Sequence, residues 1–176
     1  MEDSLTTKVR EVFDGSAKSS SGVSLNDALM VGSTLQDDLF GELIRFRSRK
    51  NALTADMEKM YRQIKVHPED AIYQKIAFRA NPDEPIKVFT LNTVKYGTSC
   101  ASFLSIRALH QLAHYEGSAH PLAASALKQD FYVDDLLTAA NTHEEALLLR
   151  NDLIQLLHIG GFNLQKWASI RSVRYF

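Results

Sequence analysis

The 176-residue chain has one cysteine, one tryptophan and no long apolar run. The single cysteine, Cys100, excludes an internal disulfide and fits a reducing compartment. No apolar stretch approaches the roughly 18 residues that span a membrane, and the polar start Met1–Ser4 lacks the apolar region of a signal peptide. We therefore expect an intracellular, cytoplasmic protein with no membrane partner.

The chain also lacks a strong net charge, since its formal charge is -1 at pH 7. The charges are unevenly divided along the sequence, however. Residues 45–95 carry 11 basic and 6 acidic side chains, whereas residues 1–44 carry 3 basic and 8 acidic ones. The basic middle third indicates either a surface that contacts phosphates or an ordinary solvated face.

The spacing of apolar residues predicts an α+β fold. The segments with strand patterns include 52–56, 72–79, 86–94 and 162–168. Helical spacing is found at 34–47, 99–115 and 142–158, and a further short helix is expected at 121–128. Thr34 and Thr142 are the predicted N-caps of two of these helices, and the second and third strand segments are predicted to form a hairpin.

The most informative segment is 131–138, in which the adjacent carboxylates Asp134 and Asp135 interrupt strand-forming apolar residues. Asp56 ends another apolar stretch 78 residues upstream. Adjacent like charges repel each other and lose hydration at the edge of a buried strand, so a cation would stabilise them. Oxygen ligands favour Mg²⁺ or Mn²⁺, and two such ions can activate a hydroxyl and stabilise a leaving pyrophosphate. The alternative is a hairpin whose turn contains two aspartates without a metal.

Four segments, taken in order, resemble the polymerase motifs of reverse transcriptases: 53–64, Gly97 before a helix, 132–135 and 160–167. Three more resemble specifically the BEL/Pao group of long-terminal-repeat retrotransposons: 12–18, 22–27 and 36–40. This resemblance extends over about 3–170. It implies the fingers and palm of a right-hand nucleic-acid polymerase, with an antiparallel palm sheet that carries the catalytic aspartates and has helices packed on one face.

The resemblance also implies how the chain is divided. We expect a single partial domain, with fingers at about 1–50 and 65–95 and palm at about 51–64 and 96–170. The chain is then expected to stop before a thumb, which would weaken its grip on a primer-template. Residues 171–176 are unassigned.

The resemblance gives catalytic roles to four residues. Asp56, Asp134 and Asp135 would hold two Mg²⁺ or Mn²⁺ ions, together with the backbone carbonyl of Met57. Lys166 would protonate the departing pyrophosphate.

Three further residues would bind the substrate. Tyr61 would collide with a 2′-hydroxyl and so select deoxynucleotides. Gly97 would allow a close approach of the backbone, and Arg10 would grip the triphosphate. Without the resemblance, Tyr61 is an ordinary core aromatic and Gly97 a simple turn between a strand and a helix.

The implied function is that of an RNA-directed DNA polymerase, a fragment of a retrotransposon polyprotein. It would transfer deoxynucleotides from triphosphates to the 3′-OH of a primer on an RNA or DNA template, and a retroelement particle or the nucleus becomes an alternative location. Ala101 and Ser102 depart from the Ser-Pro pair that the family usually has. One alternative is an inactive retroelement remnant that keeps the fold and binds nucleic acid weakly, and another is a nucleotidyl cyclase.

Overall fold

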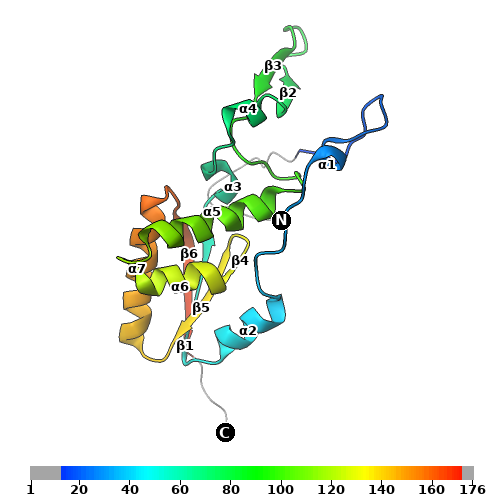
Figure 1. Cartoon of the computed structure of the whole chain (residues 1–176). Coiled ribbons are helices and arrows are strands. Elements are labelled where there is room, and N and C mark those ends of the chain that lie inside the picture. Colours follow the sequence, from blue (N-terminus) through cyan, green and yellow to red (C-terminus); the bar gives the residue numbers. More distant parts are fainter. Residues whose placement is uncertain (1–12, 172–176) are drawn as a thin grey trace.

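A four-stranded antiparallel sheet forms the centre of the molecule in the computed structural model, which describes residues 13–171 (Figure 1). Its strands, in spatial order, are β4 (Phe131–Tyr132), β5 (Asp135–Ala140), β1 (Asn51–Met57) and β6 (Leu164–Arg171). Burial alternates along β1: Leu53, Ala55 and Met57 are buried, while Thr54 and Asp56 on the opposite face are half-buried. The predicted α+β class and antiparallel sheet are confirmed.

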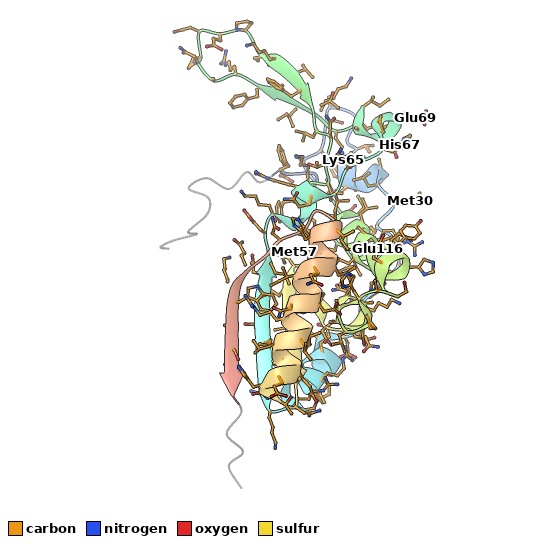
Figure 2. The ribbon with its side chains drawn as sticks, turned by 90° about the vertical axis from the view of Figure 1, so that its left-hand side faces the viewer. Met30, Met57, Lys65, His67, Glu69 and Glu116 are labelled. Carbon is orange, nitrogen blue, oxygen red and sulfur yellow. The ribbon has the colours of Figure 1, made fainter. Side chains whose placement is uncertain are left out.

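Three helices cover one face of this sheet: α5 (Ala101–Glu116), α6 (Pro121–Gln129) and α7 (His143–Ile159). Figure 2 shows β1 and β6 on the left of these helices. The helices and strands share one apolar core, in which Leu109, Leu136 and Leu153 have no exposed surface. No helix within residues 13–171 is long and apolar enough to cross a membrane.

Capping residues decide where two of the helices begin. Thr142 accepts a hydrogen bond from the Glu145 N–H at 3.1 Å, and the Glu145 carboxylate accepts from the Thr142 N–H at 3.4 Å, which forms a capping box and confirms the predicted start of α7. The predicted start at Thr34 is wrong. The helix α2 (Leu39–Arg47) begins after Asp38, whose carboxylate accepts from the Gly41 N–H at 2.8 Å.

A two-stranded hairpin lies apart from the sheet, at the top of Figure 1. It consists of β2 (Lys75–Phe78) and β3 (Lys87–Thr90), which pair antiparallel and confirm the predicted hairpin in shorter form. The short helices α3 (Met60–Gln63) and α4 (Pro68–Ala71) lie on the segment that leads from β1 to the hairpin. A further turn of helix, α1 (Leu25–Ala28), precedes α2.

Candidate active site

The carboxylates of Asp56 and Asp135 lie side by side on adjacent strands. The register of β1 and β5 places Asp56 directly opposite Asp135, close to the end of β1 that Met57 marks in Figure 2. Directly opposed residues of antiparallel strands point to the same face of a sheet, with Cβ atoms roughly 4.5–5.5 Å apart. Asp56 is half-buried and Asp135 is exposed. Two of the predicted site residues are therefore brought together.

Asp134 lies in the turn that joins β4 to β5. Tyr132 pairs with Asp135, so Val133 and Asp134 form a two-residue loop. Val133 has a φ of +56°, which is rare for a β-branched residue, and a positive φ at the first loop residue is typical of a type II′ hairpin. The Asp134 carbonyl accepts a hydrogen bond from the Met57 N–H at 2.8 Å. The turn is thus attached to the end of β1, beside Asp56.

Two consecutive residues of β6 hold the Asp56 carboxylate. The Gln165 amide donates to Asp56 Oδ1 at 2.9 Å, and Lys166 Nζ lies 3.3 Å from Asp56 Oδ2. The ladder between β1 and β6 shifts its register between Thr54 and Asp56, and Lys166 at this bulge has a φ of +53°. The bulge inserts an extra residue, so both side chains reach the same carboxylate.

The electrostatics of the site show that its carboxylates repel each other. Burial raises the pKa of Asp135, and the negative charges of Asp134 and Asp56 raise it further, while the Lys166 ammonium lowers it. Asp135 therefore holds its proton to a higher pH than an ordinary aspartate does. A bound cation would reverse this effect, because it favours the ionised form of each nearby carboxylate.

The donor set suits a hard cation, since all three acids offer oxygen ligands. A hollow of about 490 Å³, lined by residues that include Asp56, Asp135, Thr54 and Lys166, lies over these groups. As the side chains stand, however, no three Asp, Glu, His or Cys residues within 13–171 are gathered closely enough to hold a metal ion. Lys166 occupies Asp56 Oδ2, so an ion would have to displace its ammonium and draw the carboxylates together.

Tyr61 lies in a small apolar cluster next to the Val133 turn. Its side chain is 9% exposed and packs with Val94 and Ala101, and Val133 packs against the same cluster. The Tyr61 ring meets the edge of the Tyr96 ring at a centroid distance of 4.5 Å, and its hydroxyl lies 3.4 Å from Ser102 Oγ. The structure thus gives Tyr61 a packing role beside the Val133 turn, and its role as a sugar gate stays a prediction.

Gly97 lies against the first described residues of the chain. It has a φ of +93°, and a Cβ atom there would come within 1.9 Å of the Phe13 carbonyl oxygen, so only glycine fits. Gly97 therefore makes a close backbone approach to the protein's own chain, and its approach to a substrate stays a prediction. The predicted triphosphate ligand, Arg10, lies outside the described residues.

Two residues whose side chains hold predicted site residues in place were not predicted from the sequence. Gln165 contacts Asp56, as described above. Asn26 joins the segment of Gly97 and Ser99 to the loop that contains Ser16. Its amide donates to the Gly97 carbonyl at 3.0 Å and to Ser16 Oγ at 2.9 Å, and its side-chain carbonyl accepts from the Ser99 N–H at 2.8 Å. No local signal identifies either contact, because the bulge and the separation of 71 residues between Asn26 and Gly97 arise only in the folded chain.

Comparison with known proteins identifies no family model and no curated protein sequence that matches the chain.

Proposed function

We propose that this chain carries the fingers and palm of a BEL/Pao-type reverse transcriptase, an RNA-directed DNA polymerase that extends a primer with deoxynucleotides. The observation that carries the proposal is the placement of Asp56 opposite Asp135, with Asp134 in the adjoining turn and Lys166 reaching in from the neighbouring strand. Three carboxylates and one lysine thus come from three separate sequence motifs to one end of one sheet.

The residues would divide the chemistry between them. Asp56, Asp134 and Asp135 would hold Mg²⁺ or Mn²⁺, which when bound would activate the primer 3′-OH and stabilise the leaving pyrophosphate. Lys166 Nζ, now 3.3 Å from Asp56, would move to the pyrophosphate and supply a proton to it. Lys166 suits this movement because its side chain is 55% exposed and belongs to a bulge.

The partners would be an RNA or DNA template with its primer, and deoxynucleoside triphosphates. The hairpin β2–β3, which stands apart from the sheet, and the basic residues of 45–95 support a fingers region, because such a surface can contact phosphates. The open face of the sheet at Asp56 and Asp135 supports a palm that meets the primer end.

A second candidate is an inactive retroelement remnant that keeps the fold and binds nucleic acid weakly. One observation favours it: the Asp56 carboxylate contacts both Gln165 and Lys166. Within residues 13–171, Asp56, Asp134 and Asp135 do not lie close enough together to hold a metal ion. In this candidate the ion pair between Lys166 and Asp56 is permanent and neutralises the carboxylate.

A single-nucleotide incorporation assay separates the candidates. We expect the protein, in excess over a primer-template at low salt, to add one deoxynucleotide in the presence of Mg²⁺ or Mn²⁺. Asp134→Asn should abolish this addition, while Asp70→Asn, an exposed aspartate of α4, should leave it unchanged. If the Asp134→Asn variant still incorporates the nucleotide, the assignment of Asp134 to the catalytic site is wrong. A reaction of nucleotide without primer would indicate a cyclase, and no reaction of any kind would indicate the remnant.

A further inference from the structure

We infer that Gln165 is a positioning residue, which fixes the Asp56 carboxylate in the orientation that a divalent cation requires. The inference rests on the proposed function, because it concerns a residue that would hold the ion. It adds a role for a side chain that would itself touch neither the ion nor the nucleotide.

The two oxygens of Asp56 have partners of different kinds. Gln165 Nε2 donates to Oδ1 at 2.9 Å, and Lys166 Nζ lies 3.3 Å from Oδ2. The amide is neutral and half-buried, whereas the ammonium is charged and belongs to a side chain that is 55% exposed. A divalent cation repels the ammonium strongly and the amide only weakly. Lys166 would therefore leave when an ion binds, and Gln165 would stay.

The backbone explains why Gln165 is the fixed partner. Gln165 lies directly opposite Asp56 in the ladder between β1 and β6, so strand pairing sets its position. The ladder pairs Thr54 with Ala168, which leaves one residue of β6 in excess between the two pairs. Neighbouring residues of a regular strand point to opposite faces. Only the bulge therefore allows Lys166 to reach the same carboxylate from outside the regular register.

The hydrogen bond from Gln165 also opposes the repulsion inside the site. Asp56 faces Asp135 across the strands, and like charges in directly opposite positions destabilise each other. Without Gln165, the Asp56 carboxylate would turn away from Asp135 and lose the orientation that directs it to a shared ion. Removing such a supporting hydrogen bond typically lowers metal affinity or activity by about 10-fold to 100-fold.

Mn²⁺ binding, measured by electron paramagnetic resonance of the free ion, tests the inference without requiring catalysis. The Mn²⁺ site of interest is the one that is lost in Asp56→Asn. We expect Gln165→Met to raise the Mn²⁺ dissociation constant of this site by about 10-fold or more. Gln155→Met, the same change at an exposed position of α7, is the matched control and should bind as the wild type does. Urea denaturation should show a cooperative unfolding transition for both variants, so that weaker binding cannot be attributed to an unfolded protein. Gln165→Ala should weaken binding to a similar extent, and it replaces Gln165→Met if methionine disturbs the strand.

The outcomes for Gln165 and for the proposed function can be told apart. If the wild type binds Mn²⁺ at Asp56 without incorporating a nucleotide, and Gln165→Met binds 10-fold more weakly, the function fails and the inference stands. If the wild type incorporates a nucleotide and Gln165→Met binds Mn²⁺ as tightly as the wild type, the inference is overturned. If the Asp56→Asn variant binds as much Mn²⁺ as the wild type does, the proposed function and the inference about Gln165 are both overturned.

Discussion

A buried carboxyl group makes the stability of this fold depend on pH. Glu42, on α2, is 2% exposed, and its Oε2 atom is buried without a hydrogen-bond partner. Burial raises the pKa of Glu42 from 4.5 to about 7. The nearby Arg45 lowers this pKa, while Asp37, Asp130 and Asp38 raise it. Glu42 is therefore largely protonated in the folded protein below neutral pH and is forced to ionise above it.

The sign of the effect follows from proton binding. Between pH 4.5 and about 7 the folded state keeps the Glu42 proton that the unfolded state has released, so the free energy of unfolding falls as the pH rises. The fall ends above the folded pKa, where both states are ionised. One pKa unit corresponds to 1.36 kcal/mol, so the total cost is about 3 kcal/mol, of which about 2–3 kcal/mol falls between pH 5 and pH 8.

Replacement by glutamine tests this reasoning. Glu42→Gln cannot ionise, so its stability relative to the wild type should increase by about 2–3 kcal/mol between pH 5 and pH 8. Urea denaturation followed by circular dichroism at several pH values measures this change. Any constant offset from the new amide group cancels in the comparison. The pKa of Asp130 is also raised by burial, but its contribution is present in both proteins.

The matched control is Glu84→Gln, at an exposed position between β2 and β3, which should leave the pH dependence unchanged. The reasoning would be refuted if the difference in free energy of unfolding between Glu42→Gln and the wild type were the same at pH 5 and at pH 8.

Two further substitutions test residues near the candidate site. Gly97→Ala should lower the free energy of unfolding, measured in urea, by more than about 2 kcal/mol, because the new Cβ would collide with the Phe13 carbonyl. The control Gly22→Ala, at a φ of +80° in open space, should lower it by only about 1–2 kcal/mol. Equal losses in the two variants would mean that the close approach at Gly97 is unimportant. Tyr61→Ala should increase the use of ribonucleotides relative to deoxynucleotides in single-nucleotide incorporation, because the clash with the 2′-hydroxyl is steric. An active Tyr61→Ala protein with the wild-type preference would show that Tyr61 serves packing alone.

Local signals in the sequence predicted much of the fold. The start of α7 at Thr142 follows from a capping box, which needs only residues three apart in the chain. The strand that ends near Asp56 and the hairpin at Asp134 and Asp135 follow from short apolar patterns and their interruption by acids. The resemblance to polymerases implied that Asp56, Asp134 and Asp135 share one site, but not which of them pair, and the register of β1 and β5 places Asp56 opposite Asp135.

The features that could not be predicted depend on tertiary contacts. Thr34 is also an acceptable N-cap by residue type, although a weaker one than Asp38. The chain before α2 is used differently: the Gln36 amide donates to the Phe131 carbonyl at 2.7 Å and holds the base of the Asp134 hairpin. The contact of Gln165 with Asp56 depends on the bulge at Lys166, and strand alternation alone cannot indicate an extra residue.

The central claim is that Asp56, Asp134 and Asp135 together hold two divalent ions. Its most direct test is a crystal structure of the protein grown with Mn²⁺ and a deoxynucleoside triphosphate, with an anomalous difference map at the manganese edge. We expect two peaks roughly 3.5–4 Å apart, with carboxylate oxygens of the three aspartates about 2.0–2.6 Å from the ions, and the Lys166 ammonium displaced from Asp56. A map from saturated crystals that shows no manganese between Asp56 and Asp134, with Lys166 still paired to Asp56, would contradict the account.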